Sequence, residues 1–137
     1  APVVNTYSLE TTIAEKLDAI LNLMEFSSRM KDYYDIYYLA NKFDFDGAVL
    51  TEALRKTFVN RSHVFTVAQL EQIVAFDGDE AMQKKWRAFC RKTDIKNDDY
   101  STVLQTIKVF LTKPFTAAVD GGSFSEKWST SAQCWLL

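Results

Sequence analysis

Glycine and proline are scarce in this 137-residue sequence, which has four glycines and two prolines. Together with a hydrophobic content of 47%, this scarcity excludes collagen-like, low-complexity and disordered chains. No apolar stretch approaches the roughly 18 residues that a membrane-spanning helix needs, so we expect no membrane partner. Because 16 basic residues nearly balance 18 acidic ones, any contact with nucleic acid or lipid must be local.

Cysteine and histidine are equally rare. Cys90 and Cys134 lie far apart without a CxxC motif, which indicates reduced thiols and a cytoplasmic protein. The only histidine is His63, so a multi-histidine metal site is excluded. A lone histidine in a polar connecting segment is typical of the surface, and we assign it no role. The glycine-rich and catalytic signatures of common nucleotide-binding folds, hydrolases and zinc proteases are also absent.

Apolar residues recur at helical spacing along most of the chain. The pattern predicts a single domain over residues 1–137 of the mainly α class, a bundle of about six helices. A short extended segment over residues 2–7 precedes the bundle, and an aromatic tail with Trp128 and Trp135 follows it. This tail either packs back on the helices or covers a partner. The predicted helices span residues 9–24, 30–43, 46–59, 66–76, 77–92 and 100–113.

Several helix ends carry recognisable signals. Ser8 is a candidate N-cap of the first helix, and Thr66 with Gln69 forms a capping box. A second capping box, Asp77 with Glu80, is expected to open the fifth helix. Pro114 is expected to kink or end the last helix, with a further turn as far as Val119, because proline has no N–H to donate to the preceding turn.

The second predicted helix begins with a pair of carboxylates. Asp32 and Asp35 are three residues apart and therefore share a face. Such a pair can bind Mg²⁺ or orient an attacking hydroxyl, and a nearby lysine can neutralise phosphate charge. The simpler interpretation is structural, because Arg29, Lys31 or Lys16 can pair with either aspartate at the start of a helix. Spacing alone leaves both interpretations open.

The strings YSLE (7–10), AEKLDAI (14–20) and SRMKDYYDIYYL (28–39) resemble the C-terminal part of the AbiEii/AbiGii nucleotidyltransferase toxin family. Members of that family have a similar "leeilAEKl.al" helix followed by an "(R/K)DyyDiy.l" helix. The later strings FLTKP (110–114) and FSEKW (124–128) are similar to the family's "fl.P" and "f...W" elements. The resemblance therefore extends over the whole chain.

The resemblance implies the helical C-terminal region of a toxin that transfers nucleotides from a nucleoside triphosphate to RNA, in type IV toxin–antitoxin or abortive-infection systems. It implies that Lys16 contacts the triphosphate and that Asp32 and Asp35 act as a base or a metal-proximal carboxylate. Arg29 and Lys31 would contact phosphate. The implied partners are an RNA substrate and an antitoxin.

The sequence departs from the family pattern in one respect. Nothing before Tyr7 supplies the Gly-Ser turn and the metal-binding Asp-x-Asp pair of the family's N-terminal domain, and Asp44 and Asp46 follow a helix end, as loop and capping residues do. We therefore expect the chain to be the C-terminal part of a longer protein whose N-terminal domain is its partner. The intact parent would bind Mg²⁺ and NTP; this chain alone would bind no metal or cofactor and would be inactive.

A basic helix is the remaining candidate for binding. Lys84, Arg87 and Arg91 lie on one stripe of the fifth predicted helix, where they could contact an RNA backbone or simply form a solvated face. The alternative function is a stand-alone helical protein-interaction or RNA-binding module without catalysis. Such a module would use this helix and the tail that contains Trp128 and Trp135.

Overall fold

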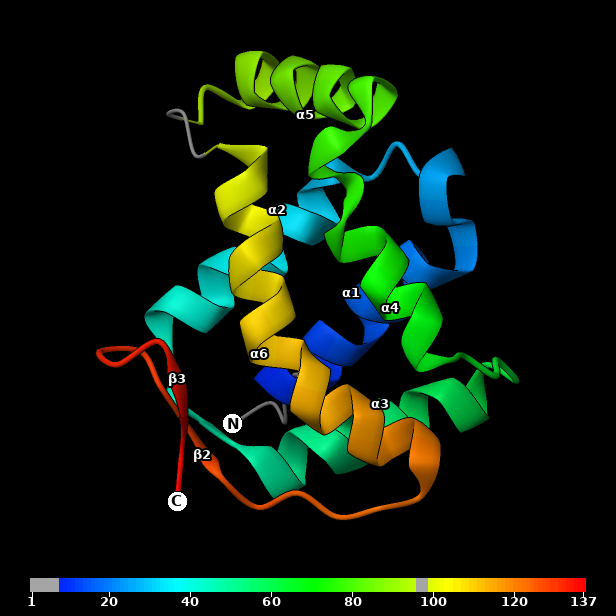
Figure 1. Ribbon diagram of the computed structural model, residues 1–137, viewed down its shortest axis with the longest axis vertical. Helices are drawn as coiled ribbons and strands as arrows, with labels where there is room; N and C mark the ends of the chain where they lie inside the picture. The colour runs from blue at the N-terminus through cyan, green and yellow to red at the C-terminus, as the bar shows by residue number, and fades with distance from the viewer. Residues whose placement is uncertain (1–7, 96–98) are drawn as a thin grey trace, which may run out of the picture.

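The computed structural model describes residues 8–95 and 99–137, and the extended segment expected over residues 2–7 lies outside these ranges. The described residues confirm the mainly α class, with six α-helices arranged around one core (Figure 1). The helices are α1 (Leu9–Leu23), α2 (Met30–Lys42), α3 (Gly47–Asn60), α4 (Val67–Val74), α5 (Glu80–Thr93) and α6 (Tyr100–Asp120). The shorter elements are the 3-10 turns η1 (Met24–Phe26) and η2 (Phe76–Gly78) and the strands β1 (Phe45–Asp46), β2 (Lys127–Ser129) and β3 (Cys134–Leu136).

Helix α6 organises the core, because it contacts α2, α3 and α4 (Figure 1). Its apolar residues recur at helical spacing, so they form one continuous buried face. Helix α1 packs against α2 and α3 on the other side of the core. Although α6 has 21 residues, neither it nor any other described helix is long and apolar enough to cross a membrane. The fully buried residues of α6 include Val103, Ile107, Phe110, Leu111 and Phe115.

Pro114 was expected to kink or end the last helix, with a further turn as far as Val119. The helix does not end there: α6 continues through Pro114 to Asp120, one residue beyond that further turn. A proline inside a helix leaves the carbonyl four residues earlier without its donor, here that of Phe110. The indole N–H of Trp135 donates to this carbonyl at 2.9 Å, and its ring stacks on the Phe110 ring with centroids 5.8 Å apart. A donor from the tail therefore replaces the one that proline lacks.

The tail packs back on the helices. Its strands β2 and β3 pair antiparallel, and β2 also pairs with β1, so that Trp128 lies between Phe45 and Trp135 in the sheet. The Trp128 indole N–H donates at 2.8 Å to the carbonyl of Ala40, one of the last carbonyls of α2, which have no donor within their helix. Each tail tryptophan thus satisfies a backbone oxygen of a different helix.

The strand β1 was not expected. It lies between the end of α2 and the start of α3. Asp46 caps α3 by accepting from the N–H of Ala48 at 2.9 Å, and Asp44 accepts from the N–H of Thr130 at 2.8 Å, which confirms that this pair has loop and capping roles. Gly47 is required here, because a Cβ would lie 2.6 Å from the carbonyl oxygen of Glu126.

The capping predictions hold at two of three sites. Ser8 caps α1, and Thr66 with Gln69 forms the expected capping box on α4. The box of Asp77 with Glu80 is wrong: Asp79 caps α5 by accepting from the N–H of Met82 at 3.0 Å. Asp77 lies instead in η2, because a 3-10 turn precedes the helix and delays its start.

We expect Trp135→Phe to lower the free energy of unfolding by about 1–3 kcal/mol, because the Phe110 carbonyl loses its donor while remaining buried. In a Pro114→Ala background the cost should be smaller, since the new N–H of residue 114 can donate to the same carbonyl. Urea unfolding of the four proteins in this double-mutant cycle measures the difference. An equal cost in both backgrounds would contradict this role of Trp135.

Alkaline unfolding should depend on the core tyrosines Tyr33 and Tyr100, whose rings pack edge to face with centroids 5.8 Å apart. Burial raises the pKa of both phenols well above the ordinary value of 10.0. The unfolded chain ionises them first, so the stability present below pH 10 is lost as the pH rises further. Tyr33→Phe should move the alkaline unfolding midpoint, followed by circular dichroism, to higher pH. Tyr38→Phe, at an exposed position, should leave the midpoint unchanged.

Candidate functional site

The link between α1 and α2 determines where α2 begins. The hydroxyl of the buried Ser27 accepts from the backbone N–H of Arg29 at 3.1 Å. The ammonium of Lys85 in α5 donates to the carbonyls of Glu25 and Ser27, both at 3.0 Å. These bonds fix the link between α1 and α2 and fasten it to α5.

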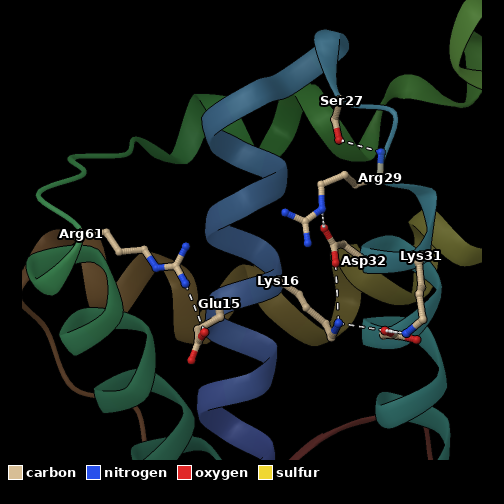
Figure 2. A network of polar contacts seen from close by, with 8 residues as sticks. Glu15, Lys16, Ser27, Arg29, Lys31, Asp32 and Arg61 are labelled. Carbon is tan, nitrogen blue, oxygen red and sulfur yellow. Dashed lines mark hydrogen bonds and ion pairs between the residues drawn. The ribbon is translucent and has the colours of Figure 1, made fainter.

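The hairpin brings together all the residues that the sequence singled out in it, of which Figure 2 labels Lys16, Arg29, Lys31 and Asp32. The Nζ atom of Lys16 lies 2.8 Å from Asp35 Oδ2 and 3.6 Å from Asp32 Oδ1. Lys31 Nζ lies 2.6 Å from the same Asp35 oxygen, and Arg29 Nε lies 2.9 Å from Asp32 Oδ2. The ion pairs that the structural interpretation predicted are therefore present, and the residues still share one surface.

The two carboxylates of the hairpin differ in how deeply they are buried. The side chain of Asp32 is 4% exposed and that of Asp35 is 20% exposed, whereas Arg29 and Lys31 are 61% and 71% exposed. The contact of Arg29 with Asp32 Oδ2 is an ion pair without hydrogen-bond geometry, so this buried oxygen accepts no hydrogen bond from the described residues. The negative charge of Asp32 is therefore buried beside Arg29, which is mostly exposed, and Lys16, whose side chain is 23% exposed.

A shallow groove of about 220 Å³ runs along α1 beside this cluster. Its floor is one face of α1, with Thr12, Glu15, Lys16 and Ala19 at helical spacing. Arg29 and Asp32 line one side. The other side is Arg61, which follows directly after α3 and which sequence reasoning missed (Figure 2).

A second ion cluster flanks the groove. The buried carboxylate of Asp18 lies 2.8 and 3.0 Å from His63 Nδ1 and 3.7 Å from Arg61 Nη1. Arg61 Nη2 also donates to Glu15 Oε2 at 3.1 Å. His63 is therefore a half-buried partner of Asp18, which corrects the expectation of a plain surface residue. No local pattern could have found these pairs, because α1 and the end of α3 lie more than 40 residues apart.

The described residues do not fit a metal ion of their own. They contain no group of three or more His, Cys, Asp or Glu side chains that could hold one. Asp32 and Asp35 instead face three cations, whereas Mg²⁺ sites need uncommitted oxygen ligands. Binding of Mg²⁺ and NTP by the intact parent stays a prediction.

Only two of the three basic residues on the exposed stripe of α5 line the same cavity. Lys84, Arg87 and Arg91 are all exposed. Arg87 and Arg91 line a cavity of about 750 Å³ between α5 and α6, whose walls include Trp86 and Tyr100. Asp77 and Asp99 line it too, so its charge is mixed. Lys84 is not among the lining residues.

A family model described as "Nucleotidyl transferase AbiEii toxin, Type IV TA system" matches residues 1–120. The chain belongs to the AbiEii nucleotidyltransferase toxin family. No curated protein and no solved structure matches it. Membership implies nucleotide transfer as the family activity and an antitoxin as a partner. The matched range of this AbiEii-family chain contains the whole hairpin cluster and Arg61, and leaves out strands β2 and β3.

Proposed function

We propose that this chain forms the C-terminal portion of an AbiEii-type nucleotidyltransferase that transfers nucleotides from a nucleoside triphosphate to RNA. Its helical hairpin supplies a phosphate-binding wall of the active-site cleft. The observation that carries the proposal is the convergence of Lys16 and Arg29 on the buried Asp32 and of Lys16 and Lys31 on Asp35. The two carboxylates fix the positions of the cations, and the mostly exposed side chains of Arg29 and Lys31, with the partly exposed Lys16, remain available to phosphate oxygens.

The hairpin residues can support the transfer of a nucleotide to an acceptor hydroxyl. The acceptor hydroxyl oxygen attacks the α-phosphorus, the bond from that atom to the bridging oxygen of the β-phosphate breaks, and pyrophosphate leaves. Lys16 and Arg29 neutralise the charge that develops on the leaving pyrophosphate. The hydroxyl proton passes to a carboxylate, for which Asp35 is better suited because Asp32 is almost fully buried. Asp32 then acts as the positioning residue for Lys16 and Arg29.

In the full-length protein as its gene encodes it, Lys16→Ala and Asp35→Asn should each lower the rate of nucleotide transfer at least about 100-fold. Both side chains lie outside the hydrophobic core, so the helical circular-dichroism signal should persist. Lys16→Ala should lower the melting temperature, because the buried Asp32 then keeps only Arg29 as its cation. Transfer of a radiolabelled nucleotide from each NTP to total cellular RNA measures the rate.

The matched controls for these variants are Lys56→Ala on α3 and Asp120→Asn at the end of α6. Both remove the same charge from an exposed side chain outside the groove. They should transfer nucleotides at the wild-type rate. Normal transfer by Lys16→Ala, or loss of helical signal together with activity, would contradict the proposed role and favour a structural one.

We further propose that α5 contacts the RNA substrate through Arg87 and Arg91, with Lys84 on the same exposed stripe. Neither arginine has an ion-pair partner among the described residues, so both can approach backbone phosphates. The alternative of a protein-interaction module that docks through the tail loses its support, because Trp128 and Trp135 are buried in the fold.

The variant with both Arg87→Ala and Arg91→Ala should bind single-stranded RNA more weakly and show a shallower salt dependence, by roughly one unit of slope for each lost phosphate contact. Fluorescence anisotropy at several salt concentrations measures both quantities. The double variant with Lys56→Ala and Lys108→Ala removes equal charge from exposed positions elsewhere and should keep the wild-type slope. Identical slopes for all three proteins would exclude this contact.

A further inference from the structure

Arg61 belongs spatially to the hairpin cluster although it comes from another part of the chain. Its guanidinium lines the groove whose other side is Arg29 and whose floor carries Lys16 (Figure 2). Three cationic side chains, from the end of α3, from α1 and from the start of α2, therefore border one groove. Ala19, also in the groove lining, has a side chain of a single methyl group, which leaves space between the two arginines.

Arg61 is held in place by two carboxylates, that of Glu15 in the groove floor and that of the buried Asp18. Glu15 accepts one of its N–H groups at 3.1 Å, and the Asp18 carboxylate lies 3.7 Å from its other terminal nitrogen. Asp18 is 1% exposed and also binds His63 Nδ1 at 2.8 Å, which ties this carboxylate to the segment that follows Arg61. A long side chain that is already held by two carboxylates loses less conformational entropy when it binds a ligand.

The charge distribution favours an anionic ligand. Three cations and two carboxylates line the groove. Asp32 is 4% exposed and Glu15, which pairs with Arg61, is 30% exposed, whereas Arg61 is 44% and Arg29 61% exposed. Low-dielectric burial beneath the groove and cations at its rim direct positive charge toward solvent. Guanidinium groups on two sides match the several oxygens of a chain of linked phosphates.

We propose that Arg61 binds the phosphate chain of the nucleoside triphosphate across the groove from Arg29, and that Asp18 and His63 are positioning residues for Arg61. This inference rests on the proposed function and adds to it a phosphate-binding residue outside the hairpin. It also assigns a task to the only histidine of the sequence.

Calorimetric titration of the full-length protein with inorganic tripolyphosphate and with NTP tests the proposal. Arg61→Ala should weaken binding of both ligands about tenfold, as expected for loss of a charge-assisted hydrogen bond. Arg61→Lys should recover part of the affinity, because it keeps the charge but loses the two-pronged geometry. Lys56→Ala, which removes a charge from the helix that precedes Arg61, should bind as the wild type does.

The outcomes separate this inference from the proposed function. If Lys16→Ala loses tripolyphosphate affinity and Arg61→Ala does not, the role of Arg61 is wrong and the hairpin site stands. If neither variant changes affinity, both proposals fail. Single-stranded RNA without a triphosphate is the third probe: weaker RNA binding with unchanged tripolyphosphate binding in Arg61→Ala would overturn the assignment to the nucleotide and identify the RNA backbone as the source of phosphate.

A double-mutant cycle tests the positioning role of Asp18. Asp18→Asn should weaken tripolyphosphate binding in the wild-type protein and have no further effect in the Arg61→Ala background, because its effect passes through Arg61. Thermal melts of the same proteins report stability separately. Equal losses of affinity from Asp18→Asn in both backgrounds would show a general structural effect and overturn the positioning role.

Discussion

A buried carboxylate is stable only when it is paired with a cation. Two buried carboxylates, Asp18 and Asp32, therefore determine which cationic side chains lie beside α1. Asp32 draws in Lys16 from α1 and Arg29 from the turn before α2. Asp18 draws in Arg61 and His63 from the segment after α3. Helix α1 is thereby tied to α2 on one side and to the end of α3 on the other, and the groove with its cationic rim lies along α1 between them.

The same requirement for paired polar groups governs the tail. Pro114 deprives the Phe110 carbonyl of a donor, and α2 ends with carbonyls that have no donor of their own. The indole N–H groups of Trp135 and Trp128 satisfy one oxygen at each place. Two tryptophans of the last ten residues therefore close the fold over α2 and α6, remote from the groove on α1.

Most of the fold could be predicted because helices are local structures. The spacing of apolar residues located all six described helices to within about a turn at most ends, and Ser8, Thr66 and Asp46 were recognised from their chemistry alone. The failures involve partners from elsewhere. Strand β1 exists only because β2 pairs with it, and α6 passes Pro114 while Trp135 replaces the missing donor. The capping box predicted at Asp77 was wrong because the 3-10 turn η2 contains Asp77 and α5 begins only after it.

The sequence by itself determined the hairpin cluster, because residues three or four apart on a helix share a face and the family resemblance named Lys16, Asp32 and Asp35. It could not assign different roles to the two aspartates, because burial depends on what packs against each of them. Only the tertiary structure brought Arg61 and His63 to α1 and turned the tail tryptophans inward. Those contacts join segments far apart in the chain, so no local pattern encodes them. Their hydrogen bonds and ion pairs offset the cost of removing polar groups from water, and the tryptophan rings also bury apolar surface.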